Sequence, residues 1–289
     1  MGSINMRWRT VIKNSLIYFF LIGGAVVTLI PLYTVITVSL HSDPYFFSVQ
    51  ENITLLNYLK IWQEVPLARF YFNSVVVAAA TIFGVSILCA PCAYAFARIE
   101  FIGREILFWM VIATLMIPPT LLVIPNFLIV KHIPLLGGND IFGQGGVGWL
   151  NSYWALIVPL SFNPLIVFLL RQFYFTIPRE LEDAARMDGC NRFVIFLRIM
   201  LPLTKPAMVV VVLYTFMLSW DAYLWPLIVL IEERMFTIPI GLAMFRDAAE
   251  VQWNVLMAGC GVAAFPLLVI FVFTQRYFVR GVTLTGLKG

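Results

Sequence analysis

The sequence has little charge. Only 12% of its 289 residues are Asp, Glu, Lys or Arg, whereas 61% are hydrophobic. A soluble globular domain has about 25% charged and about 45–50% apolar residues. Because no soluble core could bury so large an apolar share, the composition excludes that class and indicates an integral membrane protein.

Residues that hold metals or carry out catalysis are scarce as well. His41 and His132 are the only histidines, and neither lies in a metal-ligand pattern. Cys89 and Cys92 have the spacing of a redox or zinc pair, but the chain has no second such pair and no histidine close to them in sequence. We therefore expect these cysteines to fill apolar space. We expect neither an enzyme nor a metal site.

The sequence also lacks a nucleotide-binding loop. Gly281 and Gly286 have the Gly-x4-Gly spacing of a Walker A motif, but Leu287–Lys288–Gly289 follows in place of Lys-Ser/Thr. No strand is expected before it. We therefore expect no cofactor in this chain.

What the chain has in abundance is long apolar runs. A helix that crosses a membrane needs about 20 residues, and six runs reach that length. The first is far longer than the apolar region of about 7–15 residues in a signal peptide, so we predict that it is a retained span. The prediction is an all-α integral membrane protein with six transmembrane helices, near residues 15–40, 71–98, 106–130, 141–170, 207–231 and 251–273.

The basic residues predict the orientation of these spans. If the N-terminus is cytosolic, 14 of the 19 Lys and Arg residues fall on the cytosolic side. The five on the other side are Lys60, Arg69, Lys131, Arg234 and Arg246. The predicted order is a cytosolic N-terminus (1–14), a first span (15–40), an extracytoplasmic segment (41–72), a core (73–275) and a cytosolic tail (276–289).

One long charged segment interrupts the apolar pattern: residues 176–206, called the charged loop below. Pro178 suits the first position of a helix, and Thr176 and Asn191 are available as caps. Gly189 can adopt the left-handed conformation that closes a helix. The residues that recur at helical spacing on one face are Leu181, Ala184, Ala185 and Asp188. We predict two short amphipathic helices hinged at Gly189, on the cytosolic side.

The charged loop resembles the EAA loop of ABC-transporter permease subunits, whose pattern is roughly E-A-A-x-x-D-G-(x)n-L-P-L-x-x-P. The matching residues are Asp183–Ala184–Ala185, Asp188–Gly189, Leu201–Pro202–Leu203 and Pro206. Asp183 stands where the family usually has Glu. The resemblance is greatest to the carbohydrate (maltose-type) branch, and it continues at three further places: Phe72–Asn73–Ser74, Ala93–Arg98 and Gln275–Gly281.

The resemblance implies a type I ABC importer permease fold with a cytosolic EAA coupling helix, in the bacterial cytoplasmic (inner) membrane. It implies a second permease subunit, usually in a heterodimer, an ABC ATPase dimer that binds ATP and Mg, and an extracytoplasmic solute-binding protein. Membrane lipid is a further expected partner, and nucleic acid is not. The residues expected to couple to the ATPase are Glu180, Glu182, Asp183, Ala184, Ala185, Asp188 and Gly189. The two alanines would allow the helix to approach a groove on the ATPase closely.

Prolines and one acid within the apolar runs suggest a solute pathway. Proline frees a backbone carbonyl, which lipid cannot satisfy but a cavity or a neighbouring helix can. Aromatic faces beside hydrogen-bonding groups suit sugar rings. The expected pathway residues are Asn163, Trp220, Asp221 and Tyr223. An interfacial aromatic belt with a snorkelling acid explains the last three equally well.

Two alternatives remain open. An acid inside a membrane span is costly and often functional, so Asp221 could be the ion site of a secondary transporter that uses no ATP. The second alternative stays within the family but changes the substrate, for example to a glycerol phosphate. Carbohydrate is the expectation, by analogy with the maltose-type branch.

Overall fold

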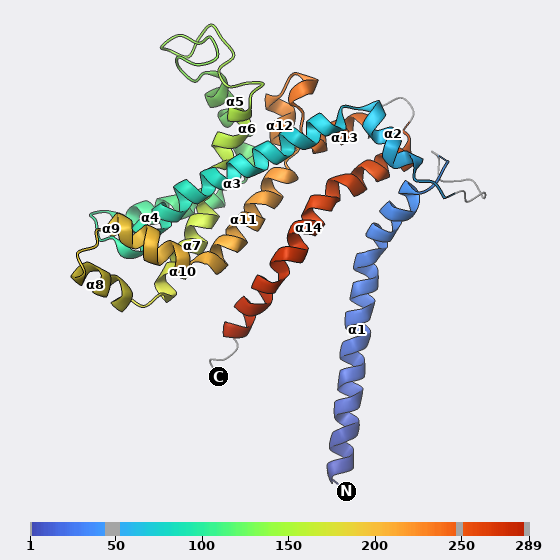
Figure 1. Cartoon of the computed structure of the whole chain (residues 1–289), viewed down its shortest axis with the longest axis horizontal. Coiled ribbons are helices and arrows are strands. Elements are labelled where there is room, and N and C mark those ends of the chain that lie inside the picture. Colours follow the sequence, from blue (N-terminus) through green and yellow to red (C-terminus); the bar gives the residue numbers. More distant parts are fainter. Residues whose placement is uncertain (1, 44–52, 247–250, 286–289) are drawn as a thin grey trace. The chain divides into compact units, whose positions relative to one another are not determined.

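The computed structural model describes residues 2–43, 53–246 and 251–285, in which every regular element is a helix and no regular strand is present (Figure 1). Residues 44–52 of the predicted extracytoplasmic segment and 286–289 of the predicted tail lie outside the described residues. The chain divides into two compact units. One comprises residues 1–65 and 244–265, and the other comprises residues 66–243 and 266–289.

The first unit contains α1 (Gly2–Ser39), α2 (Leu56–Glu64) and the start of α14 (Trp253–Thr285). Side chains of α1 are exposed from residue 13 to residue 34, as expected for a helix that is apolar on all sides and is surrounded by lipid. Asn57 of α2 and Asn254 of α14 hold the end of α1. Both side-chain amides donate hydrogen bonds to the His41 carbonyl, at 2.7 and 3.1 Å.

The second unit is built around α3 (Leu67–Arg98), whose 32 residues give a length of about 48 Å. Its long buried face packs against α6 (Tyr153–Leu160), α7 (Pro164–Thr176) and α11 (Lys205–Trp220). Small residues permit this close packing. A Cβ atom added to Gly84 would lie 2.3 Å from Ser161 Oγ, so only glycine fits there.

Other helices that begin in the second unit are short, because the chain bends between them. A pair of helical stretches, Arg104–Met116 and Pro119–Lys131, meets at an angle of 96°. Pro118 and Pro119 lie at this break. The elements are α4 (Arg104–Ala113), η1 (Thr114–Met116), η2 (Pro119–Leu122), α5 (Val123–Lys131), α12 (Leu224–Val229), η4 (Glu233–Met235) and α13 (Ile238–Arg246).

Three helices in the described part of the chain are long and apolar enough to cross a membrane: Lys13–Ser39, Leu67–Arg98 and Trp253–Gln275. Three bent pairs pass the same test when each pair is taken as one span. Besides the pair bent by 96°, these are Tyr153–Leu160 with Pro164–Thr176, bent by 40°, and Arg192–Leu203 with Lys205–Trp220, bent by 79°. These six segments overlap the six apolar runs, but two have shifted bounds. The fourth covers 153–176, and the fifth covers 192–220, so that it starts inside the charged loop and ends before residue 231.

A polar network joins the first turns of α3 to the chain after α12. Asn73 is fully buried, and its amide donates to the carbonyls of Arg234 and Phe236, at 2.9 and 2.8 Å. The Tyr153 hydroxyl donates to Asn73 Oδ1 at 2.7 Å. Asn151 Oδ1 accepts from the backbone N–H groups of Ile231 and Glu232. These bonds fix the irregular backbone of residues 230–238 at the end of α3 that is remote from Arg98.

Candidate functional site

The first half of the charged loop folds into α8 (Glu180–Met187). Its acidic first turn, which includes Glu180, suits the positive end of the helix dipole. The helix begins two residues after Pro178, so the prediction that this proline starts it is wrong. Thr176 does not cap α8 either, because it is the last residue of α7 and its hydroxyl donates to the Phe173 carbonyl.

Gly189 closes α8 in the predicted left-handed conformation, with φ = +80°. The N–H of Gly189 donates to the Arg186 carbonyl and the N–H of Cys190 to the Ala185 carbonyl, both at 3.0 Å. These two bonds form a Schellman motif. Asp188 is the C-cap residue of α8 and directly precedes Gly189, so the Asp-Gly pair forms the turn that ends the helix.

The second half of the charged loop starts with α9 (Arg192–Ile195), which Asn191 caps as predicted by accepting from the Val194 N–H at 2.9 Å. A π-helical turn follows, η3 (Phe196–Met200), and then α10 (Leu201–Leu203). Pro202 has no N–H to donate to the preceding turn, and the wider π turn lies directly before it. The predicted second amphipathic helix is therefore three short segments in one irregular helical stretch.

The faces of α8 differ from the expected arrangement. Ala184 and Asp188 are exposed, as are Leu181 and Met187, but Ala185 is buried in the core. The prediction of a single face carrying both alanines is therefore wrong, because Ala185 packs inward against the spans. The exposed face is left to Leu181, Ala184, Met187 and Asp188.

Glu182 points inward with Ala185, and only 3% of the surface of Glu182 is exposed. Its Oε1 lies 3.2 Å from Nε of Arg98, the last residue of α3, in an ion pair whose side chains are 4% and 3% exposed. The Tyr94 hydroxyl donates to Glu182 Oε2 at 3.2 Å. By contrast, Asp183 is exposed and pairs with Arg186 at 3.4 Å. Of these adjacent carboxylates of α8, one is therefore buried and the other exposed.

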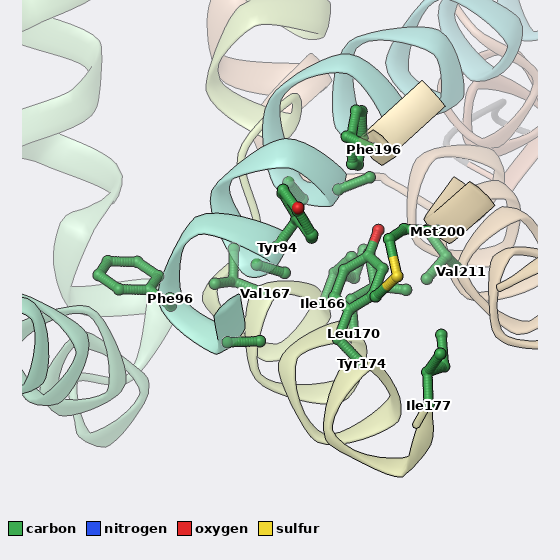
Figure 2. Close-up of a cluster of buried hydrophobic side chains, with 14 of the residues drawn as sticks. Tyr94, Phe96, Ile166, Val167, Leu170, Tyr174, Ile177, Phe196, Met200 and Val211 are labelled. Atoms are coloured by element: carbon green, nitrogen blue, oxygen red, sulfur yellow. The ribbon is translucent and has the colours of Figure 1, made fainter. Parts of the chain in front are cut away.

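Arg98 also binds the end of α7. Its Nη2 donates to the carbonyls of Tyr174 and Ile177, which lie at the C-terminal end of that helix. We call Arg98, Glu182 and Tyr94 the clamp. Figure 2 shows Tyr94 beside Tyr174 and Phe196, with ring centroids 5.7 and 5.3 Å from that of Tyr94. Tyr94 thus connects the clamp to one buried hydrophobic cluster, to which α3, α7, α8 and the π turn contribute.

A polar hollow of about 190 Å³ lies over the clamp. Arg98 pairs with Glu182 and Arg186 with Asp183, which leaves two arginines and one acid on its walls in no ion pair among the described residues. The lining residues are Arg98, Glu100, Arg179, Glu182, Asp183, Arg186 and Arg192. The hollow can therefore accept a negatively charged group.

The predicted pathway residues lie apart from the charged loop. Asn163 caps α7 at its break from α6, where its Oδ1 accepts from the Leu165 N–H at 2.9 Å. Trp220 is buried, with its ring 5.0 Å from that of Phe216. Asp221 and Tyr223 lie in the unwound residues between α11 and α12, and both are exposed.

The clamp was not predicted from the sequence. Arg98 was expected only as a basic residue at the cytosolic end of a span, with no partner. Two features of the sequence could have indicated the clamp: Arg98 ends an apolar helix, and Glu182 directly precedes Asp183, the acidic residue of the EAA pattern. Such a pairing joins distant parts of the chain, and no local pattern specifies it.

Comparison with known proteins agrees with this architecture. A family model described as "Binding-protein-dependent transport system inner membrane component" matches residues 82–284. The chain is 36% identical over 239 residues to the arabinooligosaccharides transport system permease protein AraQ of Halalkalibacterium halodurans, covering 82% of this chain and 81% of AraQ. It is 30% identical over 279 residues to the sn-glycerol-3-phosphate transport system permease protein UgpE of Yersinia pestis, covering 91% and 94%.

A solved chain of a bacterial ABC transporter involved in the import of the acidic polysaccharide alginate shares the fold, with a TM-score of 0.78 at 20% identity. The match covers 91% of this chain and 96% of the other. These findings confirm the expected fold class and identify a transport component that is not the ATPase. The chain belongs to the binding-protein-dependent transport system inner membrane component family, the permease subunits of ABC transporters.

Proposed function

We propose that this permease subunit imports a sugar or oligosaccharide, and that α8 of the charged loop couples it to the ATPase. The observation that carries the coupling is the shape of α8. It is a short capped helix with an exposed face at Leu181, Ala184, Met187 and Asp188, and its opposite face is buried on the spans. An isolated helix of this length is unstable in water. Its order therefore depends on packing, and its exposed face is held ready for a partner.

The charged loop faces the cytosol in this proposal, as the basic residues favour. Both termini are then cytosolic, and the network at Asn73 lies on the extracytoplasmic side, where the solute-binding protein delivers its ligand. A second permease subunit, in a heterodimer, completes the pathway, and lipid surrounds exposed spans such as α1. The ATPase dimer binds ATP and Mg.

Docking would use two features of the charged loop. Ala184 has a side chain small enough for a groove on the ATPase to approach the helix backbone. The hollow beside it carries Arg179 and Arg192, which have no ion-pair partner among the described residues and would receive an acidic side chain of the ATPase. Glu180, Asp183, Asp188 and Gly189 complete the docking surface, while Glu182 and Ala185 hold it from below.

Carbohydrate is the proposed substrate class because AraQ, the relative with 36% identity, belongs to an arabinooligosaccharide system. Glycerol phosphate is the second candidate, since the UgpE relatives match over 91% of this chain. In the pathway, Tyr223 and Asp221 would meet the solute at the unwound stretch between α11 and α12. Trp220 borders that stretch beside Tyr71, whereas Asn163 lies beside Cys89, farther along α3, and would line another part of the pathway.

The test is reconstitution of the chain with its second permease, ATPase and binding protein in proteoliposomes. ATP hydrolysis and uptake are measured with an arabino-oligosaccharide, an alginate oligosaccharide and sn-glycerol 3-phosphate. Stimulation by an oligosaccharide supports the proposal. Stimulation by sn-glycerol 3-phosphate alone would refute carbohydrate as the substrate class and favour glycerol phosphate. Uptake that follows an ion gradient and needs no ATP would refute the coupling to an ATPase and turn attention to Asp221.

A further inference from the structure

We infer that Arg98 is a positioning residue that transmits the movement of α8 to the spans, through its buried ion pair with Glu182. The inference rests on the proposed docking of α8 to the ATPase. It adds a mechanical connection between α8 and the membrane-spanning helices α3 and α7, which we call the joint. The joint consists of the clamp: Arg98, Glu182 and Tyr94.

The position of Arg98 suits this role. It is the last residue of α3, the helix that packs along α6, α7 and α11. Its guanidinium group contacts the Tyr174 and Ile177 carbonyls and the Glu182 carboxylate. One side chain therefore joins three elements: the end of α3, the end of α7 and the middle of α8.

Glu182 is held from α3 at two points. Arg98 contacts Oε1 at 3.2 Å, and Tyr94, one helical turn before Arg98, donates to Oε2 at 3.2 Å. Residues four apart on a helix lie on the same face, so α3 presents both groups together. The Arg98 contact is an ion pair without a hydrogen bond and the Tyr94 contact is a hydrogen bond, so two contacts from α3 hold the two oxygens of one carboxylate. The carboxylate cannot pivot without breaking one of them.

The connections on both sides of α8 do not fix it in the same way. The connections at 177–179 and 188–191 are not helical and, apart from the contacts of the clamp, are held by apolar contacts: Ile177 is buried in the core and Cys190 packs against it. Within α8 itself, only Glu182 and Ala185 are buried. Ala185 contributes a single methyl group to the core, which resists sliding weakly. If the clamp were absent, only these apolar contacts would oppose a shift of α8 relative to α3 and α7.

A buried ion pair is better suited to this task than to stabilising the fold. Desolvation of the two charges offsets most of their attraction, so such pairs add little net stability. Removing one partner leaves a buried charge without compensation, which makes any separation of α8 from α3 unfavourable. Each movement of α8 is therefore transmitted to α3 and α7 as a rigid displacement.

Another buried arginine in the same unit provides a matched control. Arg171 of α7 binds Glu105 of α4 at 3.0 and 3.1 Å and donates to the Phe96 carbonyl of α3 at 3.2 Å. This arginine also joins three helices, but it makes no contact with α8. Glu105→Gln removes the same charge as Glu182→Gln does in the clamp, although Glu105 is more exposed.

The experiment uses the complete importer in proteoliposomes and measures the amount of solute taken up per ATP hydrolysed. For Glu182→Gln and Arg98→Lys we expect the ATPase to co-purify and to hydrolyse ATP. The solute transported per ATP should fall about tenfold, within the range of typical coupling energies. Glu105→Gln should lower the melting temperature without changing this ratio.

Tyr94→Phe is the second variant, since it removes only a hydroxyl group and should leave the fold intact if Glu182→Gln does not assemble. It should lower the same ratio by a smaller factor. An unchanged ratio in Tyr94→Phe and in each clamp variant that assembles, or an equal fall in Glu105→Gln, would overturn the inference. Loss of ATPase co-purification from the unmodified chain would instead refute the docking proposal, so the two failures are distinguishable.

Discussion

Replacing Gly189 by valine tests whether the turn after α8 is a mechanical part of the charged loop. Its φ of +80° lies in the left-handed region, where an L-residue costs about 1–2 kcal/mol and a β-branched one is a clear outlier. An added Cβ atom would meet no heavy atom within 4 Å. The whole cost therefore comes from backbone strain and none from a packing clash.

Strain of this size changes a conformational equilibrium by about 5- to 30-fold. Either the Schellman bonds break and the end of α8 unwinds, or the turn opens and α8 shifts from its buried position. Both outcomes disturb the docked helix, so we expect Gly189→Val to lower uptake much more than ATP hydrolysis. Gly189→Asn should behave nearly as the unmodified chain does, since asparagine tolerates this conformation best among non-glycine residues.

Gly103 offers a matched control. It has φ = +83° before α4, and an added Cβ atom there also meets nothing within 4 Å. Gly103→Val should therefore cost similar strain outside the charged loop and leave the uptake per ATP unchanged. The assay is uptake and hydrolysis in proteoliposomes, normalised to assembled complex. Normal uptake with Gly189→Val, or equal losses in the two variants, would refute the assignment of the turn to coupling.

Three further predictions concern other parts of the second unit. Ala184→Arg should abolish co-purification of the ATPase, because it places a long side chain on the proposed docking face, whereas Ala68→Arg on an exposed turn of α3 should not. Asn73→Ala should lower the melting temperature in detergent, since each buried carbonyl left unpaired costs about 1–3 kcal/mol. Gly84→Val should reduce the yield of folded protein, because its Cβ atom collides with Ser161, and Ser161→Gly should partly restore it.

Each of these predictions has a contrary outcome. Normal co-purification with Ala184→Arg would remove α8 from the ATPase interface. An unchanged melting temperature with Asn73→Ala would mean that water or other groups satisfy the two carbonyls. Equal yields for the single and double variants would show that Ser161 is not what excludes a side chain at Gly84.

Local chemistry was predictable wherever a residue acts on its own neighbours. The left-handed Gly189, the cap at Asn191 and the break at Pro118–Pro119 follow from backbone sterics and hydrogen bonding within a few residues. The start of α8 was misplaced by two residues. Pro178 fits a first helical position, but the chain first turns away from α7, whose end is bound by Arg98.

The face of α8 could not be predicted, because helical spacing relates residues to one another but does not say which side meets the protein. The pattern placed Ala184 and Ala185 together, and the fold separated them by burying Ala185. The same limit applies to the four pathway candidates. The structure buries Trp220 and leaves Asp221 and Tyr223 exposed, and spacing alone could not distinguish them.

The sequence by itself determined the membrane class, the apolar runs, the family and the place of the charged loop, since these depend on composition, run length and ordered motifs. Only the tertiary structure decided that Glu182 is buried while Asp183 is exposed, and that Arg98 receives the buried carboxylate. The physical reason is that a buried charge needs a partner. The packing of α3, α7 and α8 brings that partner from a distant part of the chain, where no local spacing records it.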